Sequence, residues 1–324
     1  MYKKNQTFSN EIFLLGFQNL QNFKIPLFSL FQVIYLLTIC ENIFIIVLVS
    51  TSHNLQSPMY FFLQHLSMCD LVETNTIVPI MLKTITQDGV KLPLIGCITQ
   101  LSFFGSSEAF QCLLLSVMSF DRYLAICNPL RYITIMNRRV CVQLTLIPFL
   151  LSFVIIPCFT LAPISTLQFC EQNTIDHFFC DFIPLLELSC SDASFVQHNV
   201  IYLSVPVVMF PFMFIVLSYI YIVRSILQIT SSIGRQKAFS TCSSHLAVVS
   251  MFYGTITGVY VIPSRKHLLT INKVLSLLYT VVIPFLNPVI YTLRNKDIKD
   301  ALKTLLGNPS INTLNQYKGL RSTG

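Results

Sequence analysis

The chain has 324 residues, of which 53% are hydrophobic and only 11% are charged, with a formal net charge of +7. Soluble domains carry about 25% charged residues, so a water-soluble globule could hardly cover its surface with this composition. The same numbers exclude an intrinsically disordered chain and indicate a polytopic membrane protein.

Long apolar runs predict the membrane spans, because a helix needs about 20 mainly apolar residues to cross the hydrocarbon. Four runs lack Asp, Glu, Lys and Arg: 141–170, 193–223, 238–264 and 274–293. Three earlier runs are interrupted by isolated acids. Runs of this length do not fit the alternating strands of a β-barrel. We predict an all-α membrane protein, a seven-transmembrane helix bundle with spans at about 26–52, 58–82, 98–121, 141–162, 198–223, 238–262 and 273–293.

The charge distribution predicts the orientation. Thirteen of the 21 Lys and Arg residues fall on one side of the predicted bundle, so the positive-inside rule places the N-terminus outside the plasma membrane. Asn5 lies in a glycosylation sequon within the predicted extracellular tail, 1–25. The receptor domain would span 26–293, and the cytoplasmic tail 294–324. An amphipathic helix is expected at about 296–306, with its apolar side made by Ile298, Ala301, Leu302, Leu305 and Leu306.

Eleven cysteines divide by position. Seven lie in spans or on the predicted cytoplasmic side, where thiols stay reduced. The other four, Cys97, Cys170, Cys180 and Cys190, lie on the predicted outside, and four cysteines allow three pairings. Sequence spacing does not choose among these pairings.

Acids inside spans are expensive, so each one is a candidate functional residue. Asp70 and Glu73 are three residues apart on one helix face, so they either share a bound cation such as sodium or stay protonated beside nearby hydroxyls and amides. Asp121–Arg122–Tyr123 ends the third span. Arg122 is either a snorkelling side chain or a latch that Asp121 holds in one state and releases in another.

Five segments carry a resemblance to a known family. They are PMYFFLQHLSMCD at 58–70, MSFDRYLAICNPLRY at 118–132, HFFCD at 177–181, KAFSTCSSHL at 237–246 and PFLNPVIYTLRN at 284–295. In this order and spacing they resemble vertebrate olfactory (odorant) receptors, of the rhodopsin-like, class A, G-protein-coupled receptors. The resemblance covers roughly residues 5 to 306.

The resemblance implies roles for matching residues. It implies disulfides Cys97–Cys180 and Cys170–Cys190, with Cys97–Cys190 as the alternative. It implies a polar core of Asn42, Asp70 and Asn287, and a coupling and activation switch made by Asp121, Arg122, Tyr123, Tyr219, Asn287, Pro288 and Tyr291. Two residues depart from the family pattern: Glu41 replaces a usual Gly, and Gln111 replaces a usual Glu that would help Asp70 to hold sodium.

The implied function is odorant reception: a small, mostly apolar molecule binds from outside and activates a stimulatory heterotrimeric G protein and the cAMP pathway. Counting back about four turns from Arg122 along a regular helix reaches Phe104, Gly105, Glu108 and Ala109 in the third span. The other expected ligand-binding residues, in spans five, six and seven, are Leu203, Ser204, Val207, Tyr253, Ile256, Thr257, Tyr260, Tyr279 and Thr280. Glu108 would either anchor a cationic ligand such as an amine, or stay protonated or bonded to a neighbouring group.

Other functions fit less well. A channel or transporter would often show repeats or rings of pore charges, and the sequence shows neither. A light sensor would need a Lys in the last span, and 274–293 contains none. Enzyme signatures are absent from the sequence, and we expect no cofactor. The expected partners are an odorant, a G protein and membrane lipids, and not nucleic acid. The remaining alternative is a rhodopsin-like receptor for another small ligand outside the olfactory epithelium.

Overall fold

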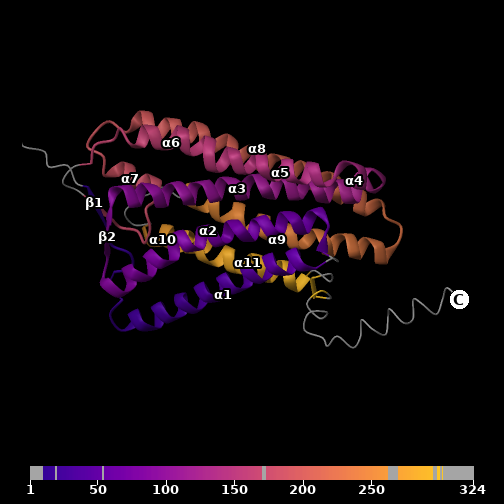
Figure 1. Ribbon diagram of the computed structural model, residues 1–324, viewed down its shortest axis with the longest axis horizontal. Helices are drawn as coiled ribbons and strands as arrows, with labels where there is room; N and C mark the ends of the chain where they lie inside the picture. Colours follow the sequence, from indigo (N-terminus) through magenta and orange to yellow (C-terminus); the bar gives the residue numbers. More distant parts are fainter. Residues whose placement is uncertain are drawn as a thin grey trace, which may run out of the picture.

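The computed structural model describes residues 10–18, 20–52, 55–169, 173–261, 269–294, 298–299 and 301. These residues form an elongated bundle of helices that lie roughly along one axis (Figure 1). The seven long helical segments are α1 (Lys24–Thr51), α2 (Pro58–Gln87), α3 (Leu94–Cys127), α5–α6 (Arg138–Leu150 and Ile156–Ile164), α8 (Ser194–Gln228), α9 (Ser232–Val261) and α10–α11 (Leu269–Leu277 and Ile283–Arg294).

Five of these segments are both long and apolar enough to cross a membrane: α1, α3, α5–α6, α8 and α10–α11. The other two, α2 and α9, have 30 residues each, which is long enough at about 1.5 Å per residue. They carry buried polar side chains, including Asp70 and Glu73 in α2 and His245 in α9. These polar groups are buried against neighbouring helices, so α2 and α9 can lie within the bundle although they are less apolar than the other five segments.

Two of the seven helical segments, α5–α6 and α10–α11, contain a wider, π-helical turn before a proline. Residues Leu151–Ile155 join α5 to α6 and precede Pro157, and Leu278–Val282 join α10 to α11 and precede Pro284. A proline in a helix has no N–H to donate and its ring clashes with the carbonyl four residues earlier. A π turn relieves this clash and often occurs at functional sites.

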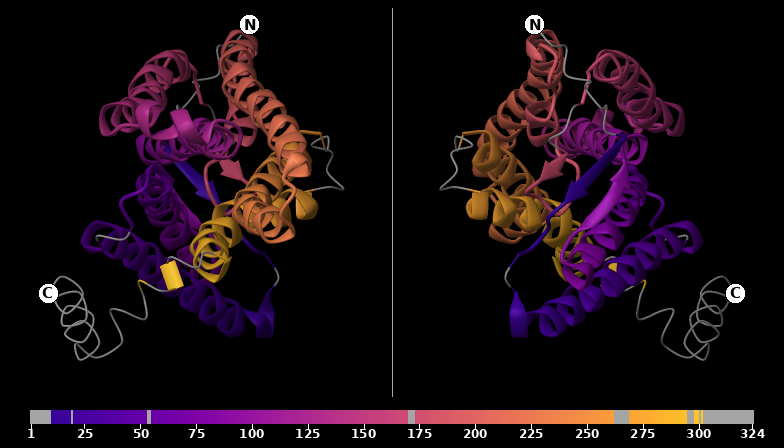
Figure 2. Two further views of the ribbon diagram at one scale, coloured as in Figure 1. Left: turned by 90° about the vertical axis from the view of Figure 1, so that its right-hand side faces the viewer. Right: turned by 90° about the vertical axis from the view of Figure 1, so that its left-hand side faces the viewer.

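A small sheet covers one end of the bundle. Strand β1 (Glu11–Leu14) pairs antiparallel with β2 (Val90–Pro93) and parallel with β3 (Thr174–Ile175). The right-hand view of Figure 2 shows β1 lying across this end, which we call the strand end. The sequence predicted no strands there. Residues 11–14 are ordered by backbone pairing and not by a periodic apolar pattern. Helix α1 begins at Lys24, so it starts inside the predicted extracellular tail, 1–25.

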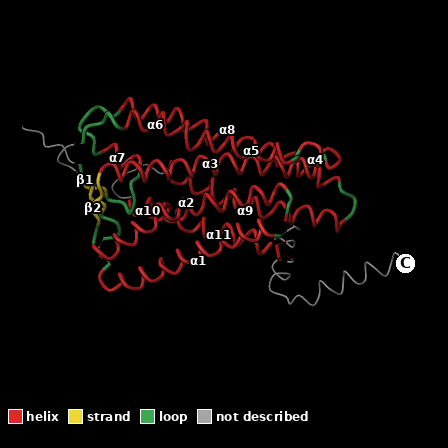
Figure 3. The backbone as a smooth tube through the Cα atoms, in the orientation of Figure 1, coloured by secondary structure: helices red, strands yellow, loops and turns green. Residues whose placement is uncertain are grey.

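The opposite end, which we call the α4 end, carries the short helix α4 (Pro129–Ile135) between α3 and α5 (Figure 3). Here α3, α8 and α9 extend beyond the apolar runs of the sequence, because a helix outside hydrocarbon does not need apolar side chains. Ile298 and Ala301 are buried in the main core of the bundle. The rest of the amphipathic helix predicted at 296–306 lies largely outside the described residues.

Candidate functional site

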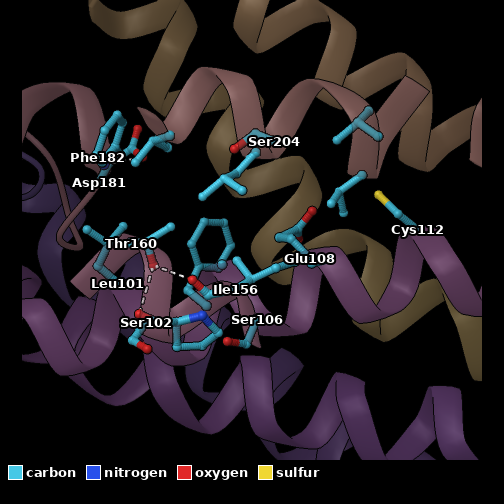
Figure 4. Close-up of a pocket in the computed structure, with 18 of the residues that line it drawn as sticks. Leu101, Ser102, Ser106, Glu108, Cys112, Ile156, Thr160, Asp181, Phe182 and Ser204 are labelled. Carbon is cyan, nitrogen blue, oxygen red and sulfur yellow. Dashed lines mark hydrogen bonds between the residues drawn. The ribbon is translucent and has the colours of Figure 1, made fainter. Parts of the chain in front are cut away.

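A cavity of about 190 Å³ lies toward the strand end, between α3, α6, α8 and α9 (Figure 4). Helix α7 (Phe182–Glu187) and Tyr279, from the π turn before α11, complete its walls. Both π turns therefore border the cavity, since Ile156 and Pro157 directly follow the other one. Nine residues predicted as ligand-binding lie on the walls: Phe104, Gly105, Glu108, Ala109, Leu203, Ser204, Val207, Ile256 and Tyr279.

Three other predicted residues do not line this cavity. Tyr253 is buried and packs on Phe212, with ring centroids 4.9 Å apart. Thr280 is buried and donates to the Ser276 carbonyl at 2.7 Å. Thr257 lies on α9 away from the wall, and the side chain of Tyr260 lies outside what the structure describes.

Sequence reasoning missed two walls. The first is α6, which contributes Ile156, Pro157, Thr160, Leu161 and Ile164. Counting along a regular helix could not place them, because the preceding π turn changes the direction of the side chains. The second is the start of α7, where Asp181, Phe182 and Ile183 follow the disulfide-bonded Cys180. The position of these three residues next to a predicted bridge was an available signal.

The walls are mostly apolar, with a few hydroxyl groups and two carboxyl groups. Ser102, Ser106, Thr160 and Ser204 supply hydroxyls, and Thr160 already donates to the Ile156 carbonyl at 3.1 Å. The carboxyl groups belong to Glu108 and Asp181, and no described Lys, Arg or His lines the cavity. Asp181 accepts from the Phe182 backbone N–H at 2.7 Å, while burial raises the pKa of this loop carboxyl. Such walls suit a small organic molecule with few polar groups.

The loop between α6 and α8, which we call the lid, covers the cavity and is tied to the bundle. A disulfide joins Cys97 of α3 to Cys180, and the Cys180 N–H donates to Gln100 Oε1 at 2.9 Å. Phe179 reaches the Phe104 ring on the cavity wall, at 5.2 Å between centroids. The Cys97–Cys180 bond excludes Cys190 as the partner of Cys97. Cys190 is also disulfide-bonded, and its expected partner, Cys170, lies outside the described residues.

Lys273 of α10 ties this lid to the N-terminal segment of the chain. Its ammonium donates to Asp176 Oδ1 at 2.6 Å and to the Gly16 carbonyl at 2.8 Å. Gly16 has a φ of +63°, and a Cβ there would lie 2.4 Å from the Thr84 side chain, so glycine is required. Nearby, burial and the charge of Lys273 lower the pKa of His177 to about 3, so this loop imidazole stays neutral.

A polar core lies deeper in the bundle. Asn287 donates to both oxygens of Asp70, at 3.2 and 3.1 Å, and Asn42 donates to the Pro284 carbonyl at 3.2 Å. The Gln111 amide donates to Glu73 Oε2 at 2.8 Å and to Asp70 Oδ1 at 3.4 Å. It therefore bridges the two acids through its NH₂ group.

Several buried oxygens of this region have no hydrogen-bond partner among the described residues, namely Glu73 Oε1, the Thr74 and Ser107 hydroxyls and Asn287 Oδ1. Oxygen ligands of this kind fit a hard cation. Among the described residues, no group of three or more His, Cys, Asp or Glu side chains could hold a metal ion, so carboxylates alone would not enclose it.

The Asp-Arg-Tyr segment lies at the α4 end of α3. Asp121 is fully buried and pairs with Arg122, whose Nε donates to Asp121 Oδ2 at 2.9 Å. Tyr132 of α4 donates to the other oxygen of Asp121 at 2.8 Å. Burial and the nearby Asp121 raise the pKa of Tyr132, so its phenol remains a donor. Arg122 is thus latched. Tyr123 contacts Tyr221 of α8, with ring centroids 6.1 Å apart.

Two tyrosines of the expected activation switch, Tyr219 and Tyr291, lie on α8 and α11. Tyr219 of α8 lies 2.8 Å from Nδ1 of His245, and Nε2 of His245 lies 3.1 Å from the Leu115 carbonyl of α3. His245 thereby links α8, α9 and α3, a role that the sequence did not predict. The buried Tyr291 hydroxyl, three residues after Pro288, has no hydrogen-bond partner among the residues that the structure describes. In the described part of the chain, neither phenol is hydrogen-bonded to Arg122.

A cavity at one end, a latched arginine at the other and a polar core between them define a seven-transmembrane receptor of the rhodopsin-like class. A family model described as "Olfactory receptor" matches residues 31–308. The chain is 46% identical to human olfactory receptor 11L1, covering 90% of this chain and 91% of that protein. It is 45% identical to mouse olfactory receptor 5G29, covering 94% and 96%. The chain belongs to the olfactory receptor family, a family of G-protein-coupled receptors and not of enzymes.

Proposed function

We propose that this receptor binds a small, mostly apolar odorant in the cavity between α3, α6, α8 and α9 and transmits binding to a stimulatory G protein at the α4 end. The observation that carries the proposal is the position of the cavity. It shares α3 with the latched Arg122, and the polar core around Asp70 lies between them. An odorant that prefers one helix arrangement shifts the population toward it.

The strand end faces outward in this proposal, and the α4 end faces the cytoplasm. The charge distribution and the disulfide at Cys97 support this orientation, because disulfides persist in oxidising compartments. Lipid surrounds the bundle: in α8, only 11% of the most apolar stretch is buried inside the protein. Epitope tags at each terminus test the orientation. An antibody should reach only the N-terminal tag on intact cells, and access to the C-terminal tag would contradict it.

Arg122, with Asp121 and Tyr123, forms the coupling switch. In the active arrangement Arg122 leaves Asp121, while Tyr219, Tyr291 and the Asn287–Pro288 segment rearrange around it. The deciding experiment is a cAMP reporter assay of the surface-expressed receptor against a panel of odorants. We expect Arg122→Ala to abolish the cAMP response but not odorant binding. A variant that reaches the surface and signals normally would contradict this role.

Sodium binding at Asp70 and Glu73 belongs to the same proposal. The buried unpartnered oxygens beside the two acids support it, whereas the Gln111 NH₂ group opposes it, since a donor repels a cation. Basal cAMP should respond to replacement of sodium by a bulky organic cation in the wild type and not in Asp70→Asn. Equal responses of the two receptors would remove sodium from this site.

A further inference from the structure

We propose that the odorants of this receptor include small organic amines, and that the ammonium group pairs with Glu108. The inference rests on the proposed function, because it assigns a ligand class to the same cavity. Its starting point is a carboxyl group on an otherwise apolar wall.

The Glu108 carboxyl is open to the cavity. It lies on α3 and points into the space bordered by Ser204 of α8 (Figure 4). None of the residues that the structure describes donates a hydrogen bond to this carboxyl or forms an ion pair with it. Three fully buried acids of α2 and α3 behave differently: Asp70 accepts from Asn287, Glu73 from Gln111, and Asp121 from Arg122. A carboxyl group in a low-dielectric site normally has such a partner.

The surrounding charges favour a cation as the missing partner. The second carboxyl group on the cavity wall is Asp181. No described basic side chain lines the cavity to offset the two carboxyl groups. A carboxylic acid ligand would add another negative charge, whereas an ammonium group would neutralise one in a site that is poorly screened by water.

The remaining walls define the rest of the ligand. Val207, Val208, Ile256 and Val259 offer apolar surface, and the cavity volume is about 190 Å³. A primary amine with a short alkyl or cycloalkyl group matches this combination. The competing arrangement is a protonated Glu108 that donates to a neutral oxygen of the ligand, in which case an alcohol would serve as well as an amine.

Matched ligand pairs separate these arrangements. Pentylamine against pentan-1-ol, and cyclohexylamine against cyclohexanol, keep the shape and change the charge. Their cAMP dose–response curves would be measured on surface-normalised wild type, Glu108→Gln and Glu108→Asp. Glu41→Gln is the matched control, because it removes an acid from α1 that does not line the cavity.

Charge-assisted hydrogen bonds predict that Glu108→Gln weakens the amine responses by about 10- to 100-fold and leaves the alcohols within about 3-fold. Glu108→Asp should retain the preference for the amine, and Glu41→Gln should match the wild type. Equal weakening of both ligand classes, or a wild type that answers neutral odorants and ignores amines, would overturn the proposal and leave the proposed function intact. A surface-expressed wild type that answers no odorant of any class would instead contradict the proposed function.

Discussion

Removing one hydroxyl group at the α4 end should raise the basal activity of the receptor. Tyr132 donates to Asp121 Oδ1 at 2.8 Å and so helps to hold the carboxylate that latches Arg122. A hydrogen bond to a charged group contributes about 1.5–3 kcal/mol. Because Tyr132 is only partly buried, solvent competes for this bond, and we assign it about 1 kcal/mol.

A loss of about 1 kcal/mol from the latched state alone raises the ratio of active to inactive receptor about 5-fold. The assay is ligand-free cAMP production divided by surface receptor number. The control is Tyr202→Phe, the same change at a 74% exposed residue of α8. Basal activity of Tyr132→Phe should rise about 5-fold over both the wild type and the control. An unchanged or lower basal activity would refute the latch.

Two further predictions concern the lid. Replacing Cys97 by Ser should destabilise the receptor by about 2–5 kcal/mol, read as lost surface expression; expression equal to the wild type would contradict this. His177 predicts a pH effect. Because its pKa is lowered to about 3 in the folded loop, the unfolded loop binds more protons below its ordinary pKa, about 6.5, and lid stability should fall as pH falls from there toward 3. Protease protection of the loop should follow this trend in the wild type and not in His177→Gln, and pH-independent protection of the wild type would contradict it.

The sequence predicted most of the helical bundle, because membrane helices leave long runs without charge. Those runs also explain its errors at the helix ends, where α3, α8 and α9 extend into polar surroundings. The strands were missed because their order comes from backbone pairing between segments far apart in the chain, such as Phe13 with Lys91.

The site was predicted in part, for a related reason. Counting turns back from Arg122 placed the residues of α3 on the cavity wall, because α3 is one continuous helix. The same counting could not include α6, where the π turn before Pro157 changes the register. The Tyr219–His245 contact was also missed, because it depends on how α8 and α9 pack rather than on any local pattern.

The most direct test of whether odorants bind in the cavity between α3, α6, α8 and α9 is to fill this cavity without disturbing the helices. A Cβ at Gly105, on the cavity wall, would meet no other atom within 4 Å, and the same holds at Gly254 of α9, which does not line the cavity. Gly105→Leu therefore adds a side chain to the cavity, and Gly254→Leu adds the same side chain elsewhere. With equal surface expression, odorant-evoked cAMP should be lost in Gly105→Leu and kept in Gly254→Leu. A Gly105→Leu receptor that responds like the wild type would show that odorants bind elsewhere.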